Sequence, residues 1–219
     1  YTEKPVAVGT TVQAKIDWNR RFDLTQQHSG EHMVSGVVHR IYGYDNVGFH
    51  MGADMVTIDF SGELTEQQLR EVEWEVNERI WLNSPVKCWY PSPEELKEIP
   101  YRSKKELTGS VRIVEFPGAD ICACCGTHVA HTGEIGLVKL LSVEKFHSGV
   151  RVEMLSGRRA LEYMTAVQDQ NRQISQLLSA KVMETAKAVK NLASELESKR
   201  QQVTAMENAQ FAALAEQYR

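Results

Sequence analysis

Apolar and polar residues follow two different patterns along the chain, and the change between them falls at Gly157. Up to Gly157, stretches with every second residue apolar, typical of strands, are interspersed with stretches whose apolar residues recur every three or four positions, typical of helices. All 14 glycines and all six prolines lie at or before Gly157. Because these residues mark turns and interrupt helices, we expect a globular part up to Gly157 and a helical part after it.

The elements predicted for the globular part follow one another irregularly. This order favours an α+β fold, with a mixed sheet and helices packed on it, over a doubly wound parallel sheet. Helices are predicted over 24–42 and from Thr65 through Trp81, because apolar residues in both stretches share a helix face, and a short helix is predicted over 93–99. Strands are predicted over 10–17, 54–60, 85–90, 111–116, 135–146 and 150–155.

The last part, residues 158–219, is rich in Ala, Gln, Glu, Lys, Leu and Met, which all favour helices. Apolar or small residues recur there in steps of three and four, the heptad pattern of a coiled coil, with a repeated step of four at Leu178. The seam consists of Leu178, Val182, Thr185, Val189, Leu192, Leu196, Val203 and Met206. So narrow a seam cannot bury itself, so we expect an arm that folds back as a hairpin or packs on a partner, which would allow a homodimer.

The composition excludes several classes of protein. The 219 residues are 42% hydrophobic and 25% charged, as in globular proteins and unlike disordered ones. A formal net charge of −4 excludes a globally basic nucleic-acid binder but allows a local basic patch. No uncharged apolar run approaches the ~20 residues of a membrane span. The four cysteines come without a secretory leader, so we expect reduced thiols, a metal site and a cytoplasmic location.

Two short motifs carry side chains that bind metals. His28 and His32 lie four residues apart in a predicted helix, so both imidazoles share one helix face. Cys124 and His128 have the same spacing, beside Gly126. Either pair alone is more often a structural feature, but together three nitrogens and one sulfur suit tetrahedral Zn²⁺. Only tertiary folding can bring the two distant pairs together.

These motifs resemble those of the editing domain of alanyl-tRNA synthetase and of its freestanding relatives, the AlaX-type trans-editing proteins. Residues 20–32 resemble the first family motif, residues 57–61 the strand after it, and residues 124–136 the second motif. Order and separations agree across about residues 10–157. Cys125 stands where the family usually has glycine, which places a second thiol beside the sulfur ligand.

The resemblance implies an aminoacyl-tRNA deacylase that uses zinc. It would hydrolyse the ester between a wrongly attached serine or glycine and the terminal ribose of tRNA(Ala). A second, hydrolytic site that rejects the wrong amino acid is needed, because a difference of one methyl or hydroxyl group changes the binding free energy by only about 1–3 kcal/mol. The resemblance also implies that residues 1–17 are the tail of a preceding β-domain, residues 18–157 the zinc-binding editing domain and residues 158–219 a helical arm.

The expected zinc ligands are His28, His32 and Cys124, with His128 as a fourth, weaker or displaceable ligand. Three protein ligands and an open position would let the ion activate water, whereas four are typical of a structural site.

Further residues are candidates for catalysis and substrate binding. Glu31 is predicted to accept a proton or to bind the α-amino group of the substrate, unless it is a solvated helix residue. Thr127 is predicted to hydrogen-bond near the metal, and His50 to line the pocket or to serve a structural role in its strand. Phosphate contacts with the tRNA acceptor end are predicted for Arg20, Arg21, Arg102, Lys104 and Lys105, with scattered solvated charge as the alternative.

Three other functions remain open from the sequence. The editing domain of threonyl-tRNA synthetase shares the two metal motifs, although the residues around them resemble the alanine branch more closely. A domain whose fold is held together by a structural zinc ion could bind tRNA without catalysing a reaction. A thiol hydrolase could use Cys124 or Cys125 with His131, although nothing in the sequence indicates an activated cysteine.

Overall fold

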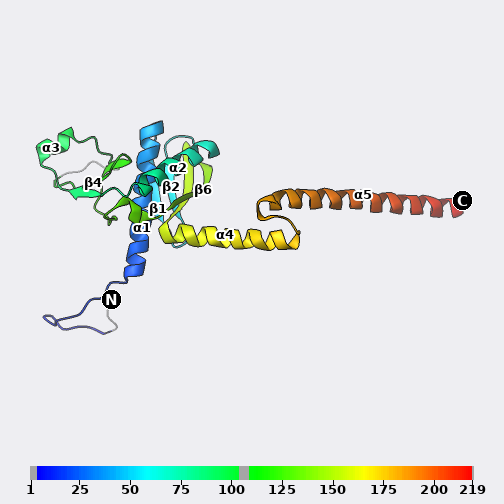
Figure 1. Cartoon of the computed structure of the whole chain (residues 1–219), viewed down its shortest axis with the longest axis horizontal. Helices are drawn as coiled ribbons and strands as arrows, with labels where there is room; N and C mark the ends of the chain where they lie inside the picture. The colour runs from blue at the N-terminus through cyan, green and yellow to red at the C-terminus, as the bar shows by residue number, and fades with distance from the viewer. Residues whose placement is uncertain (1–3, 104–108, 219) are drawn as a thin grey trace. The chain divides into compact units, whose positions relative to one another are not determined.

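The computed structural model describes residues 4–103 and 109–218 (Figure 1). The chain divides into two compact units, Tyr1–Leu161 and Glu162–Arg219, and their boundary lies close to Gly157. Within the described ranges, no helix combines the length and the apolar character that crossing a bilayer requires.

The first unit contains two antiparallel sheets. The larger has the order β1-β2-β7-β6, with β1 at Asn46–Met51, β2 at Val56–Phe60, β7 at Gly149–Ser156 and β6 at Val138–Phe146. The smaller has the order β3-β4-β5, with β3 at Lys87–Trp89, β4 at Ile113–Phe116 and β5 at Asp120–Ala123. The predicted α+β class is confirmed, but antiparallel sheets replace the mixed sheet, because short turns join β1 to β2, β4 to β5 and β6 to β7.

Three α-helices and a 3₁₀ turn accompany these sheets. Helix α1 spans Trp18–Tyr42 and begins where Asp17 accepts a hydrogen bond from the backbone N–H of Arg20. Helices α2 (Glu66–Trp81) and α3 (Pro93–Glu98) both begin with a capping box, and the 3₁₀ turn η1 covers Thr132–Ile135. The three predicted helices are confirmed, but α1 begins at Trp18, six residues before the predicted start at residue 24.

The core lies between the two long helices and the larger sheet, and α1 also contacts β5 of the smaller sheet. Its fully buried side chains include Met33, Val34 and Val37 of α1, Val72 and Val76 of α2, and Ile58, Leu140 and Val152 of the larger sheet. Helix α1 therefore packs against both sheets, which places its buried face beside the segment that follows β5.

Gly36 permits the close approach of α1 to the turn between β4 and β5. A Cβ atom at this position would overlap the carbonyl oxygen of Ala119 and lie 2.5 Å from the Cβ of Asp120. Because one of these neighbours is backbone, a larger residue could be accommodated only by moving the turn or the helix.

Several predicted elements differ from the observed ones. The strand predicted over 10–17 is wrong, since these residues are exposed and form no strand; alternation supplies no partner strand by itself. The strand predicted over 135–146 begins only at Val138, because residues 132–135 form η1. Strand β5 has no predicted counterpart, because four residues are too few to establish a period.

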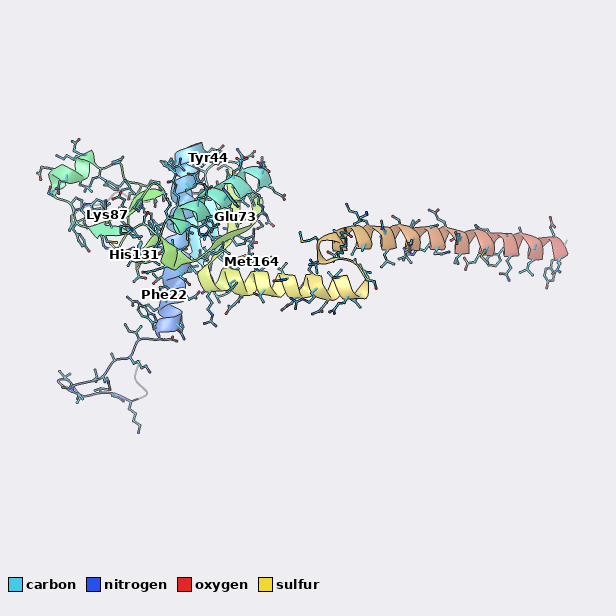
Figure 2. All side chains as sticks on the ribbon, viewed as in Figure 1. Phe22, Tyr44, Glu73, Lys87, His131 and Met164 are labelled. Atoms are coloured by element: carbon cyan, nitrogen blue, oxygen red, sulfur yellow. The ribbon has the colours of Figure 1, made fainter. Side chains whose placement is uncertain are left out.

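The helical prediction for the last part is confirmed, with an interruption. Helix α4 spans Gly157–Leu177, a 3₁₀ turn η2 covers Val182–Glu184, and α5 spans Thr185–Gln217. The break follows the repeated step of four at Leu178, and Asn171 bonds both the carbonyl of Val182 and the hydroxyl of Thr185. Side chains project from α5 along its length (Figure 2), and its apolar seam is exposed. The coiled coil stays a prediction.

Replacing Gly36 with alanine should destabilise the fold. Alanine inside a helix normally gains about 0.5–1 kcal/mol over glycine, but overpacking against backbone costs about 1–3 kcal/mol, so we expect a net loss of unfolding free energy. Chemical denaturation measures this loss. Ile41→Ala, at an exposed position of the same helix, should change stability by only about 0.5 kcal/mol. A Gly36→Ala variant as stable as the unaltered protein would contradict the close approach.

Candidate metal centre

The first half of the candidate site lies on the buried face of α1. His28 and His32 are one helical turn apart, as the motif predicts. The rotation of α1 is fixed by Gln27, whose side-chain amide donates to the carbonyl of Ser156 at 2.8 Å and accepts from the N–H of Ser156 at 2.8 Å. The amide thus satisfies backbone groups at the end of β7, which accounts for a polar residue in this interior.

The second half lies in the segment after β5. Arg112 donates to the carbonyls of Cys124 at 2.9 Å and of Gly126 at 3.0 Å, which folds this segment into a tight loop. Gly126 is required where it stands, because a Cβ atom there would overlap the ring of His28. The N–H of Val129 donates to the hydroxyl of Ser29 at 3.2 Å, so the loop is tied to α1.

Folding brings the two predicted pairs together. One possible ligand atom from each of His28, His32, Cys124 and His128 lies within 4.8 Å of all the others. The Sγ of Cys124 is 3.6 Å from the Nε2 of His28, and the Nε2 atoms of His32 and His128 are 3.4 Å apart. The four side chains form a possible metal-binding cluster, as their spacing predicts.

The second nitrogen of each imidazole meets an oxygen acceptor. The Nδ1 of His28 is 3.1 Å from the carbonyl of Thr127, and the Nδ1 of His128 is 3.3 Å from the carbonyl of Gly126. The Nδ1 of His32 is 2.9 Å from a carboxylate oxygen of Asp120. Because these oxygens can only accept, each Nδ1 carries a proton, which leaves the Nε2 atom of each ring available to a metal ion. Protein ligands of metals are commonly oriented in this way.

The electrostatics of the cluster also favour a bound cation. Burial alone would raise the pKa of Cys124, but hydrogen bonds with His28 and His32 outweigh it and lower that pKa to about 5. Burial and the nearby charge of His32 lower the pKa of His128 to about 3. At neutral pH the cysteine is therefore a thiolate and His128 is neutral, the states in which both residues bind metals.

The structure places the predicted catalytic candidates at different depths. Thr127 is exposed at the edge of the cluster, and its hydroxyl lies 3.1 Å from that of Thr25. Glu31 is only 3% exposed, so the alternative of a solvated helix residue is wrong; its Oε1 accepts hydrogen bonds from Ser35 and Asn46.

Neither of the two other side-chain predictions is supported by a close contact with the cluster. His50 of β1 is exposed, and the neighbouring Phe49 is the residue that stacks on His28, with ring centroids 6.1 Å apart. His131, a possible partner for a reactive cysteine, faces Glu134 at 3.7 Å, whereas Cys124 contacts His28 and Cys125 is exposed.

The predicted phosphate contacts fall into three groups. Arg20 and Arg21 are exposed in the first turn of α1. Arg102 is not an exposed cation: its side chain is 15% exposed and donates two hydrogen bonds to Asp120. Its position beside Lys104 and Lys105 in the sequence gave no indication of this burial. Lys104 and Lys105 lie outside the described residues.

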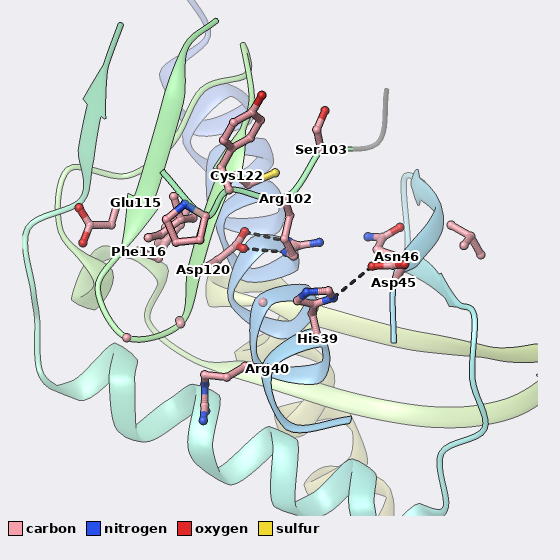
Figure 3. A pocket seen from close by; sticks show the side chains of 17 residues that line it. His39, Arg40, Asp45, Asn46, Arg102, Ser103, Glu115, Phe116, Asp120 and Cys122 are labelled. Atoms are coloured by element: carbon pink, nitrogen blue, oxygen red, sulfur yellow. Dashed lines mark hydrogen bonds and ion pairs between the residues drawn. The ribbon is translucent and has the colours of Figure 1, made fainter. Parts of the chain in front are cut away.

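A cavity of about 890 Å³ adjoins the cluster (Figure 3). It opens between α1, the start of β1 and the segment 100–103, and Arg102 and Asp120 form part of its wall. None of the four cluster residues lines it; Asp120, which bonds His32, connects the two. Sequence reasoning missed Asp120, because no spacing rule relates it to His32.

Comparisons with known proteins agree with this geometry. Residues 111–152 match the model of the second additional domain of threonyl and alanyl tRNA synthetases. The chain is 30% identical over 197 residues to the alanyl-tRNA editing protein Aarsd1 of Mus musculus, covering 88% of this chain and 48% of that protein. It is 32% identical, with the same coverage, to Aarsd1-A of Xenopus laevis.

The chain also matches part of an alanine–tRNA ligase. The chain is 32% identical over 179 residues to the alanine–tRNA ligase of Methanothermobacter thermautotrophicus, covering 77% of this chain and 20% of that enzyme. The chain spans about half the length of the curated editing proteins that it matches.

Replacing one of the two adjacent cysteines should identify the sulfur ligand. We expect Cys124→Ala to lower the affinity for Zn²⁺ or Co²⁺ at least 10-fold and to remove the thiolate-to-metal charge-transfer band of the Co²⁺ form, since among the described residues the Cys124 sulfur is the one grouped with all three imidazoles. The matched control is Cys125→Ala, whose thiol is exposed and should be dispensable. A metal affinity that falls in the control and not in Cys124→Ala would assign the ligand to Cys125.

Proposed function

The chain belongs to the family of editing domains found in alanyl-tRNA editing proteins and alanine–tRNA ligases, and we propose that it hydrolyses mischarged tRNA(Ala). The bond cleaved is the ester between a wrongly attached serine or glycine and the terminal ribose. The observation that carries this proposal is the convergence of His28, His32, Cys124 and His128, whose possible ligand atoms all lie within 4.8 Å of one another. The alanine branch is preferred to the threonine branch because the relatives reported above are, by name, alanyl-tRNA editing proteins and an alanine–tRNA ligase.

The donor set fits zinc. Three imidazole nitrogens and one thiolate match the borderline-soft, tetrahedral preference of Zn²⁺ and suit Mg²⁺ or Ca²⁺ poorly. A zinc ion held here would supply Lewis-acid activation of water and of the ester carbonyl at neutral pH.

The four ligands are not held equally firmly. His32 is buried and its Nδ1 contact is with a carboxylate at 2.9 Å, whereas His128 is half-buried and its Nδ1 contact is with a carbonyl at 3.3 Å. We therefore assign His28, His32 and Cys124 as the permanent ligands. His128 would be the fourth, more weakly held ligand, which substrate or water could displace.

Two polar residues act around the ligands. The hydroxyl of Thr127, held by Thr25 at the exposed edge, donates a hydrogen bond to the ester of the substrate. Glu31 is fixed by Ser35 and Asn46, and it contributes a stationary negative charge beside His32 that favours a bound cation. Its carboxylate, being engaged in this way, acts through the electrostatics of the ligands.

The acceptor end of the tRNA reaches the centre past the first turn of α1. Arg20 and Arg21 are exposed there and contact phosphates. The exposed seam of α5 pairs with the same seam of a second copy, which makes the protein a homodimer.

A second candidate function follows from the number of converging side chains. Four protein ligands close a tetrahedral site, as in structural zinc modules. If His128 stays bound, the domain would bind tRNA without hydrolysing it.

Deacylation assays distinguish the two functions. We expect the protein to release serine or glycine from Ser-tRNA(Ala) or Gly-tRNA(Ala) while leaving Ala-tRNA(Ala) intact, because the second, hydrolytic site must spare the correct ester. Removing the metal with a chelator should lower the rate at least 100-fold, and Zn²⁺ should restore it. Protection of the tRNA without ester loss would select the binding module, and full activity of the metal-free protein would exclude catalytic zinc.

The salt dependence of tRNA binding tests the phosphate interactions of Arg20 and Arg21. Every arginine–phosphate interaction that a substitution removes should reduce the slope of log K against log salt concentration by about 0.7–0.9, so the Arg20→Ala, Arg21→Ala double variant should flatten it by up to about 2. Lys145→Ala removes an exposed cation from β6 and should leave the slope unchanged. An equal slope for the double variant and the unaltered protein would remove the first turn of α1 from the interface.

A further inference from the structure

A buried ion pair lies directly behind His32. Asp120, at the start of β5, accepts from the Nε of Arg102 at 2.8 Å with one carboxylate oxygen, and from Arg102 Nη2 at 2.9 Å with the other (Figure 3). The second oxygen also faces the Nδ1 of His32 at 2.9 Å. The side chains of His32 and Asp120 are 5% and 1% exposed. The three residues thus form a chain from the wall of the cavity to the metal-binding cluster.

The backbone of Arg102 is joined to the same strand as its side chain. Its N–H donates to the carbonyl of Ile121 at 2.8 Å, and its carbonyl accepts from the N–H of Ala123 at 2.9 Å. These two bonds flank Cys122 along β5 and form an isolated bridge in which Arg102 lies beside Cys122. The guanidinium is therefore presented to Asp120 by a fixed backbone as well as by charge.

The partner of the His32 Nδ1 atom differs from the partners of the other two histidines in the cluster. His28 and His128 meet backbone carbonyls, whereas His32 meets a carboxylate that is itself held at both oxygens. A carboxylate increases the basicity of the imidazole opposite it and fixes the ring more firmly than a carbonyl does. Both oxygens of Asp120 are used only as acceptors, so an amide in the same place would oppose its NH₂ group to a donor.

We propose that Asp120 and Arg102 are positioning residues of the metal centre. Asp120 holds His32 with the proton on Nδ1 and the Nε2 lone pair directed at the ion. Arg102 holds Asp120 in the one orientation that does so, with a bidentate pair and a backbone bridge. This inference rests on metal binding in the proposed function, and it gives Arg102 a role at the metal in place of one at the tRNA phosphates.

A pair with the same geometry elsewhere in the fold provides the control. Asp59 of β2 accepts from the Nε of Arg151 on β7 at 2.7 Å and from its Nη2 at 2.8 Å. Neither residue belongs to the metal-binding cluster formed by the described side chains. A general effect of removing a bidentate ion pair would therefore appear in both places, whereas an effect on metal affinity would be specific to Asp120.

The test measures metal affinity, by competition with a chromophoric chelator, for Asp120→Asn, Arg102→Gln and Asp59→Asn in the full chain. We expect Asp120→Asn to weaken Zn²⁺ binding 10- to 100-fold and Arg102→Gln about 10-fold, as for other residues that orient metal ligands. Asp59→Asn should bind Zn²⁺ as the unaltered protein does. Long-range ¹H–¹⁵N spectra should show Nδ1 protonated in the His32 ring of the zinc form and a changed tautomer or broadened signal in Asp120→Asn.

Each result of these measurements supports or overturns a specific part of the proposal. Unchanged Zn²⁺ affinity in folded Asp120→Asn or Arg102→Gln overturns the proposal, and so does an equal loss in Asp59→Asn. If Asp120→Asn does not fold, Arg102→Gln, which leaves the His32 partner in place, decides alone. Failure of the unaltered protein to bind zinc overturns the metal centre itself, and zinc binding without deacylation overturns only the proposed reaction.

Discussion

The contact between α1 and β5 is the constraint on which the remainder of the structure depends. The absence of a side chain at Gly36 lets the helix lie against the turn that begins β5, and the His32–Asp120 hydrogen bond joins them at the same level. Because Cys124 follows β5 directly, this contact also sets where the thiolate lies relative to the two imidazoles. The same contact thus determines both the packing of α1 against β5 and the geometry of the possible metal-binding cluster.

Because α1 packs against both sheets, it buries several polar side chains, and Gln27, Ser29 and Glu31 among them each have a hydrogen-bond partner. Gln27 bonds the end of β7, Ser29 accepts from the loop that carries His128, and Glu31 is held by Ser35 and Asn46. A buried polar group without a partner would cost about 1–3 kcal/mol, so these bonds define a single rotation of α1. The rotation that satisfies them is the one that directs His28 and His32 toward Cys124.

How well each helix or strand could be predicted from the sequence depended on the length and regularity of its apolar pattern. The two long helices were predictable because their apolar faces repeat over several turns, and Thr65 marks the start of α2 by a local hydrogen bond. The start of α1 at Trp18, capped by Asp17, was missed, because the apolar repeat in this helix becomes regular only further along. The strand expected over 10–17 failed because alternation cannot specify a neighbouring strand. Arg102 was expected to be an exposed cation, whereas its side chain is largely buried beside Asp120; the charge is visible in the sequence and the burial is not.

The sequence by itself determined the α+β class, the helical end and the four side chains of the possible metal-binding cluster, since these depend on local periods and on residue chemistry. Tertiary structure alone decided that the two motifs meet, that Glu31 is buried, and that Asp120 and Arg102 lie behind His32. Contacts between residues far apart in the chain depend on how elements pack, and no spacing within a motif encodes that packing.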